Sequence, residues 1–116
     1  EILPIYNSFP LKEVIIHPRV RRDFYKGSPD LEAFQKALEQ CKHSVCYNGD
    51  IFTVDDYINI SKRFPSVDKM MLGRGVIVNP GLVREIKTGC KITKEEFIDI
   101  AKSRENVYEE KFLGLF

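Results

Sequence analysis

The stretch VCYNGDI, residues 45–51, decides how this chain is expected to fold. Asn-Gly is a common two-residue hairpin turn, so a β-hairpin is the first interpretation. Soon after it, however, Thr53 and Asp56 form a helix-capping pair, and a helical pattern follows over residues 54–63. A strand that passes at once into such a helix cannot turn straight back. We therefore predict a strand over residues 44–47 that leads through a turn into a helix.

The same order of strand and helix recurs on both sides of this stretch. Further strands are predicted over residues 13–17 and 69–72, and further helices over residues 31–41, 80–87 and from Thr93 onward. The β-branched run before Pro18 is typical of a strand that is buried on both faces. Alternating strands and helices imply parallel strands joined by right-handed crossovers, which places the chain in the α/β class.

Length and composition permit one domain core and exclude few functions. The chain has 116 residues, and 18 Lys and Arg nearly balance 17 Asp and Glu, so a net charge of +1 does not by itself indicate nucleic acid. No apolar run approaches the roughly 20 residues of a membrane helix. We expect a cytoplasmic protein without membrane contact. The three cysteines lack the spacing of a metal site, so reduced thiols and no bound metal are expected.

Residues suited to binding an anion follow each predicted strand. The first strand ends in His17-Pro18-Arg19, the second in Asn48-Gly49-Asp50, and the third in Gly73-Arg74-Gly75. Ligands of α/β folds bind at these carboxyl ends of the strands. Glycines there let main-chain N–H groups approach an anion, and Arg74 can add a charge-assisted hydrogen bond to phosphate. Each motif alone is commonly structural, but three consecutive strand ends together indicate an anion site.

The loop after the first strand is basic. It holds Arg19, Arg21, Arg22 and Lys26 against Asp23 alone. Taken singly, these cations would be an ordinary solvated surface. They weigh more beside the three strand ends, which together carry the residue types of an anion site.

The ordered set of motifs resembles the tRNA-dihydrouridine synthases. It consists of IHPR at 16–19 with the basic loop, YNGDI at 47–51, and MLGRG at 71–75 with Asn79-Pro80. The resemblance extends over residues 11–87 and is weaker through the last helix. In that family an FMN-bearing TIM barrel reduces the C5=C6 bond of uridines in tRNA, NADPH reduces the flavin, and a helical domain follows the barrel.

The resemblance implies a division of the chain and a role for particular residues. Residues 1–89 would be the C-terminal portion of a TIM-barrel FMN-binding domain, and residues 90–116 the start of a helical, tRNA-binding domain. The cofactor-binding residues it implies are His17 against the flavin, Asn48, Gly49 and Asp50 on its ribityl-phosphate side, and Gly73 and Arg74 at its phosphate. The residues it implies for tRNA phosphates are Arg19, Arg21, Arg22 and Lys26.

The family's catalytic motif is missing from this chain. In the family, the cysteine of an Asn-x-Gly-Cys-Pro motif donates the proton to the uridine carbon, and none of Cys41, Cys46 and Cys90 lies in such a motif. We therefore expect no catalytic residue here and no activity of the chain alone. Three parallel strands cannot close an eight-stranded barrel. We expect exposed strand edges that pair with the N-terminal part of the barrel or with a second copy.

Two alternatives stay open from the sequence. One is another FMN-dependent TIM-barrel oxidoreductase, similar to dihydroorotate dehydrogenase, that acts on a small molecule. The other is a phosphate-binding α/β module without catalysis. The choice between NADPH and NADH also stays open, because the chain has no dinucleotide-binding fingerprint.

Overall fold

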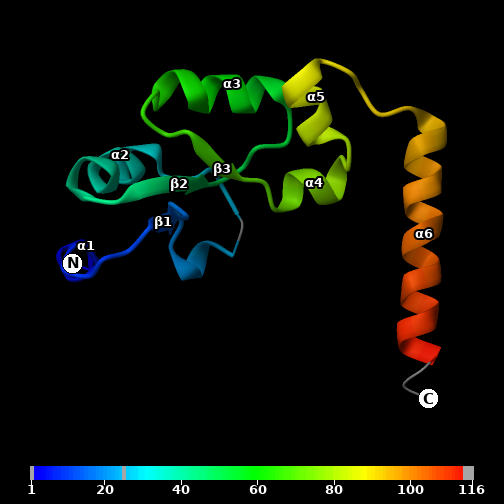
Figure 1. Cartoon of the computed structure of the whole chain (residues 1–116), viewed down its shortest axis with the longest axis horizontal. Helices are drawn as coiled ribbons and strands as arrows, with labels where there is room; N and C mark the ends of the chain where they lie inside the picture. The colour runs from blue at the N-terminus through cyan, green and yellow to red at the C-terminus, as the bar shows by residue number, and fades with distance from the viewer. Residues whose placement is uncertain (1, 25, 114–116) are drawn as a thin grey trace.

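The computed structural model describes residues 2–24 and 26–113, without the side chains of Asp23 and of residues 104–113. Its strands are β1 (Glu13–Ile16), β2 (Ser44–Asn48) and β3 (Lys69–Met71). Its helices are α1 (Leu3–Asn7), η1 (Arg21–Asp23, a 3-10 helix), α2 (Leu31–Gln40), α3 (Val54–Arg63), α4 (Arg74–Val78), α5 (Leu82–Thr88) and α6 (Lys94–Leu113) (Figure 1).

The strands form one parallel sheet in the order β1-β2-β3. Ile16 pairs with Tyr47, and Tyr47 with Met70, so the three strands end at the same edge. Helix α2 crosses from β1 to β2, and α3 crosses from β2 to β3 (Figure 1). The predicted α/β class and parallel pairing are confirmed, and the hairpin is excluded.

Local capping starts the helices where the sequence indicates. The Oγ1 of Thr53 accepts a hydrogen bond from the Asp56 amide at 3.1 Å, and the Asp56 carboxylate accepts one from the Thr53 amide at 3.0 Å. Thr93 and Glu96 make the same reciprocal pair before α6, at 3.2 and 2.9 Å. Each pair satisfies two amides that a helix start leaves unbonded. The turn after β2 is therefore fixed as an exit into α3.

The hydrophobic core lies on the face of the sheet that α2 and α3 cover. Val45 and Tyr47 of β2 contribute to it together with Phe34 of α2 and Phe64 at the end of α3. The ring of Phe34 stands edge-on to those of Tyr47 and Phe64, with centroids 5.0 and 4.8 Å apart. Such aromatic pairs add to the free energy gained by burial.

The opposite face of the sheet is partly open. Ile15 of β1 is 48% exposed and Met71 of β3 is 40% exposed. The prediction that the first strand is buried on both faces is therefore wrong, because β1 is an edge strand and no described helix covers this side. At the start of the same strands, Lys69 Nζ of β3 donates to the Glu13 carboxylate of β1 at 2.6 Å, across β2. Cys46 of the central strand β2 is buried, and this burial is the main cause that raises the pKa of its thiol.

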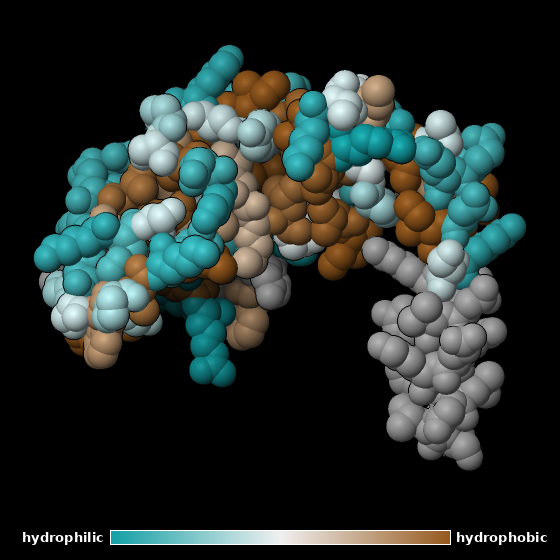
Figure 2. Space-filling model, viewed as in Figure 1, coloured by the Kyte–Doolittle hydropathy of each residue, from teal (hydrophilic) through white to brown (hydrophobic). Residues whose placement is uncertain are grey.

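Helices α4 and α5 follow β3, and α6 extends away from the sheet (Figure 1). Hydrophobic side chains gather over α4 and α5 in Figure 2, and Ile77, Val78 and Val83 are among those exposed. Within the described ranges, no helix combines the length and the apolar character that a membrane span requires.

Candidate functional site

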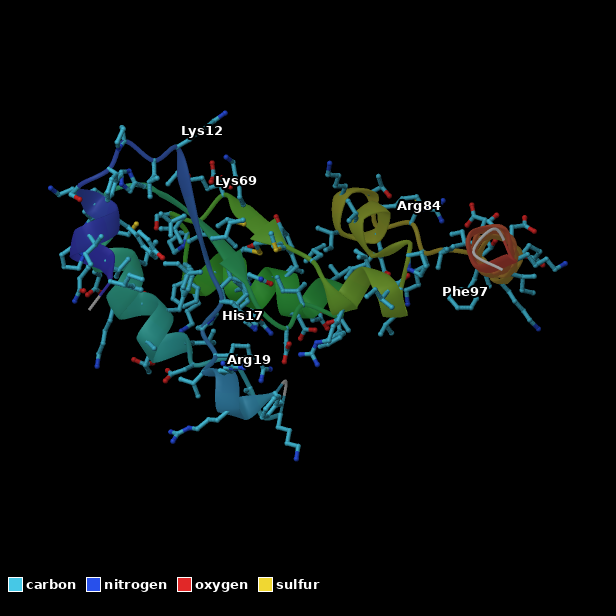
Figure 3. The ribbon with its side chains drawn as sticks, turned by 90° about the horizontal axis from the view of Figure 1, so that it is seen from below. Lys12, His17, Arg19, Lys69, Arg84 and Phe97 are labelled. Carbon is cyan, nitrogen blue, oxygen red and sulfur yellow. The ribbon has the colours of Figure 1, made fainter. Side chains whose placement is uncertain are left out.

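The carboxyl ends of the three strands enclose a hollow of about 300 Å³. All six residues predicted to bind a cofactor line it, together with five more. The lining residues are His17, Asn48, Gly49, Asp50, Ile51, Phe52, Met71, Gly73, Arg74, Gly75 and Ile77. Figure 3 shows the two ends of the sheet: Lys12 and Lys69 lie at one end, and His17 and Arg19 at the other. The structure thus brings the predicted cofactor residues together, while their binding of a cofactor stays a prediction.

Asp50 joins the loops that follow all three strands. Its Oδ2 accepts a hydrogen bond from Arg19, which follows β1, and its Oδ1 accepts one from Arg74, which follows β3. Asp50 itself follows β2, and its side chain is 24% exposed. Among the described side chains, two guanidinium groups meet one carboxylate, so this group of three residues carries more positive than negative charge. We expect Asp50 to orient the arginines, because a carboxylate repels a phosphate whereas a guanidinium binds it.

Arg19 lies inside the protein and not on its rim. Its side chain is 4% exposed. Besides Asp50, its guanidinium donates to the carbonyl oxygens of Lys26 and Gly27, each at 2.8 Å. These bonds fold the basic loop back onto the end of β2. The geometry therefore favours a supporting role for Arg19, and the proposed contact of this residue with tRNA stays a prediction.

His17 connects the first and second strand ends. Its Nδ1 lies 2.6 Å from the carbonyl oxygen of Asn48. Because a carbonyl only accepts, Nδ1 must donate, and the other ring nitrogen is left for another partner. His17 lines the strand-end hollow and also a second hollow under the basic loop.

Two glycines leave no room for a larger residue. A Cβ at Gly49 would overlap the ring of Tyr47, and one at Gly75 would overlap the backbone carbonyl oxygen of Ile51. Gly73 differs, because a Cβ there would meet nothing within 4 Å. Gly49 and Gly75 therefore serve packing, whereas the open space at Gly73 leaves its backbone accessible from the hollow.

Sequence reasoning did not single out Phe52 as a residue of the site. The guanidinium carbon of Arg74 lies 5.5 Å from the centroid of the Phe52 ring. This cation–π contact and the hydrogen bond to Asp50 hold Arg74 from two sides. The position of Phe52 directly after YNGDI was the available signal, but its contact with a residue more than twenty positions away is visible only in the fold.

Burial raises the pKa of Tyr47, the strand residue directly before the Asn48-Gly49-Asp50 turn. Tyr47 is 1% exposed, and desolvation raises the pKa of its hydroxyl, with a further contribution from the negative charge of Asp50. Tyr47 therefore stays in its neutral, protonated form at neutral pH, as a buried part of the core.

The remaining predicted cations lie outside the strand-end hollow. Arg21, Arg22 and Lys26 are exposed. Arg21 and Arg22 belong to η1, which the sequence had indicated only as loop. Together with exposed Phe24 they form a basic loop beside His17.

Comparison with known proteins gives a consistent result. The dihydrouridine synthase (Dus) family model matches residues 10–112. The tRNA-dihydrouridine(16) synthase of Neisseria meningitidis serogroup B (strain ATCC BAA-335 / MC58) is 31% identical over 90 residues, which are 75% of this chain and 27% of the relative. The tRNA-dihydrouridine(16) synthase of Shewanella oneidensis is 38% identical over 81 residues, 67% of this chain and 24% of the relative.

A third relative aligns over more of the chain. The tRNA-dihydrouridine synthase B of Shewanella oneidensis is 26% identical over 113 residues, 94% of this chain and 34% of the relative. The chain thus spans about a quarter to a third of the length of these relatives. Because the family model matches nearly the whole chain, and because relatives above 30% identity cover two thirds of it or more, the chain belongs to the dihydrouridine synthase family.

Proposed function

We propose that this chain is a segment of an FMN-dependent tRNA-dihydrouridine synthase, which reduces the C5=C6 bond of uridine in tRNA with NADPH. Family membership supports the reaction, and the names of the relatives support tRNA as the substrate. The observation that carries the proposal is the strand-end hollow, which residues from three strand ends line and at which Asp50 holds Arg74 in place. A tRNA-modifying enzyme of this kind would work in the cytoplasm.

The residues of the hollow fit the phosphate end of FMN. Arg74 is 40% exposed, so its guanidinium is reachable, and its orientation is fixed by Asp50 and Phe52. Gly73 offers an open backbone, and the side-chain amide of Asn48 offers donors at the neighbouring strand end. Bound FMN would supply hydride transfer, while these residues position the cofactor.

The chain would provide the phosphate half of the flavin site and no proton donor. Cys46 is buried within the sheet, and burial raises the pKa of its thiol. Cys41 and Cys90 do not line the strand-end hollow. The proton for the uridine carbon would therefore come from another part of the enzyme.

The fold is consistent with part of a TIM barrel. Parallel strands with helices on one face, and an opposite face that carries exposed Ile15 and Met71, are what a barrel section presents. We propose that residues 1–89 complete such a barrel together with further strands, and that α6 begins the helical domain. The ion pair between Arg84 of α5 and Glu96 of α6, called the helix clasp below, would join the barrel section to the helical domain.

The exposed cations of the basic loop would contact tRNA phosphates. Replacing Arg21 or Arg22 with alanine is expected to weaken tRNA binding and to lower the slope of log K against log salt by about one unit. Lys12→Ala is the matched control, because Lys12 is exposed at the opposite end of the sheet (Figure 3). Fluorescence anisotropy with labelled tRNA at several salt concentrations measures both quantities.

Activity provides the direct test. With NADPH, FMN and unmodified tRNA, the 116-residue chain alone is expected to form no dihydrouridine. Product detected by mass spectrometry of the digested tRNA would refute the assignment of proton donation to another part of the enzyme. Unchanged tRNA binding in both arginine variants would instead favour a small-molecule substrate.

A further inference from the structure

Phe24 is an exposed aromatic residue in a basic loop. The residue is 75% exposed, more than any other large hydrophobic residue among those described. Its φ is +43°, the left-handed region, and it is the one described residue other than glycine with a positive φ. Such a conformation is costly for a bulky side chain and persists where the surrounding structure enforces it, often at functional sites.

Hydrogen bonds tie down the loop before and after Phe24. The Phe24 amide donates to the carbonyl of Arg21 at 3.4 Å and closes η1. After Phe24, the carbonyls of Lys26 and Gly27 are fixed by Arg19, which is itself fixed by Asp50. The exposed ring is thus presented by a supported loop.

A hollow of about 270 Å³ lies beside this ring. Its lining residues are His17, Arg19, Val20, Arg21 and Phe24. The hollow therefore combines the aromatic ring of Phe24 with two arginines, Arg19 and Arg21.

We propose that Phe24 stacks against an unpaired base of RNA, with the flanking phosphates toward Arg21 and Arg22. An aromatic face supplies stacking that tolerates any base, and neighbouring arginines bind the backbone. His17 lines both this hollow and the strand-end hollow, so the stacked nucleotide lies next to the nucleotide that reacts. The inference rests on the proposed function, because it takes the partner to be tRNA.

The charge of the loop favours RNA over a protein as the occupant. Exposed Arg21, Arg22 and Lys26 lie within three residues of Phe24 in the sequence, and Asp23 is the only acidic residue of the loop from Arg19 to Pro29. The centre of a protein–protein interface is typically depleted of charged residues. A base with its phosphates matches both the apolar ring and the cations.

Fluorescence anisotropy with a single-stranded RNA of about 12 nucleotides tests the proposal on the 116-residue chain. Phe24→Ala is expected to weaken binding about tenfold without changing the salt slope, and Phe24→Tyr to restore it. Arg21→Ala is expected to lower the salt slope by about 0.7. A 2-aminopurine in the RNA should be quenched by the wild type and less by Phe24→Ala.

Phe9→Ala is the matched control, because Phe9 is 56% exposed but precedes β1, at the opposite end of the strand from the loop. Phe24→Ala affinity equal to that of the wild type, with Arg21→Ala weakened, overturns stacking and leaves the proposed function intact. Absence of RNA binding by the wild type overturns both. A Phe24→Ala effect on sedimentation but not on RNA affinity would show a protein contact and would also overturn stacking.

Discussion

Two clusters of arginine and carboxylate join separate elements of this molecule, and they differ in burial and in charge. At the strand ends, Asp50 binds Arg19 and Arg74, with side-chain exposures of 24%, 4% and 40%. Between α5 and α6, Arg84 binds Glu96 through both carboxylate oxygens at 3.1 and 2.8 Å, and both side chains are 44% exposed. The chemistry is the same, but the surroundings give the two clusters different roles.

The balance of charge separates a binding site from a structural clasp. The helix clasp is neutral, and Arg84 is further occupied by the carbonyl of Lys91. The strand-end cluster has two cations for one anion, and Arg74 also lines a hollow. A surplus charge that is held in place can bind an incoming anion without reorganising. The strand-end cluster is thus suited to ligand binding, and the clasp to fixing the start of a helix.

Replacing Asp50 should have the largest effect on the free energy of unfolding. Asp50→Asn leaves the buried guanidinium of Arg19 without its counter-charge, and removing one partner of a buried ion pair costs on the order of 3 kcal/mol. Urea denaturation followed by circular dichroism measures this loss. The control is Glu32→Gln, which breaks the exposed Arg63–Glu32 pair and should change little. Equal effects of the two substitutions would contradict the structural role of Asp50.

The glycines on either side of Arg74 should respond differently to the same added methyl group. Gly75→Ala forces a Cβ against the Ile51 carbonyl oxygen, and such overpacking typically costs about 1–3 kcal/mol. Gly73→Ala has open space and should leave stability nearly unchanged. Thermal unfolding of both variants compares them directly. A Gly73→Ala variant less stable than Gly75→Ala would refute this description of the turn.

Lowering the pH should break the ion pair between Arg84 and Glu96, the helix clasp. The pKa of Glu96 is lowered from 4.5 to about 2, chiefly by its hydrogen bonds with Arg84 and next by the Thr93 amide. A carboxyl whose pKa is depressed by folding stabilises the fold above its unfolded pKa, and this contribution is lost as pH falls toward the folded value. The expected window is pH 4.5 to 2.

NMR titration of the Glu96 side chain should give a midpoint near 2. Glu96→Gln is the control, because it should remove the pH dependence of the α5–α6 contact over this window. A midpoint close to that of an ordinary glutamate would contradict the clasp, as would an unaltered pH profile in Glu96→Gln.

Local chemistry explains what could be predicted from the sequence. Thr53, Asp56, Thr93 and Glu96 cap their helices through neighbours three residues away, so their spacing alone identified the helix starts. The common edge of parallel strands then brought His17, the turn after β2 and the turn after β3 into one hollow.

The features that sequence reasoning missed depend on distant partners. Arg19 looked like one of four surface cations, but its carboxylate partner lies 31 positions away. Ile15 has the sequence environment of a buried strand residue, yet its exposure depends on which elements cover the sheet. Periodicity reports the preference of a residue for burial and says nothing about whether a covering element is present.

Flavin binding by the 116-residue chain tests the central claim, that Arg74 of the strand-end cluster holds a phosphate. FMN and riboflavin differ only by the phosphate, and titration of either flavin with fluorescence detection gives its affinity. We expect the wild type to prefer FMN, and Arg74→Ala to lose that preference with an FMN affinity lower by about 10- to 100-fold, as for a charge-assisted hydrogen bond. Arg84→Ala, which removes an arginine of similar exposure, should bind FMN as the wild type does. Equal affinity of the wild type for the two flavins, or an unchanged FMN affinity in Arg74→Ala, would contradict the account.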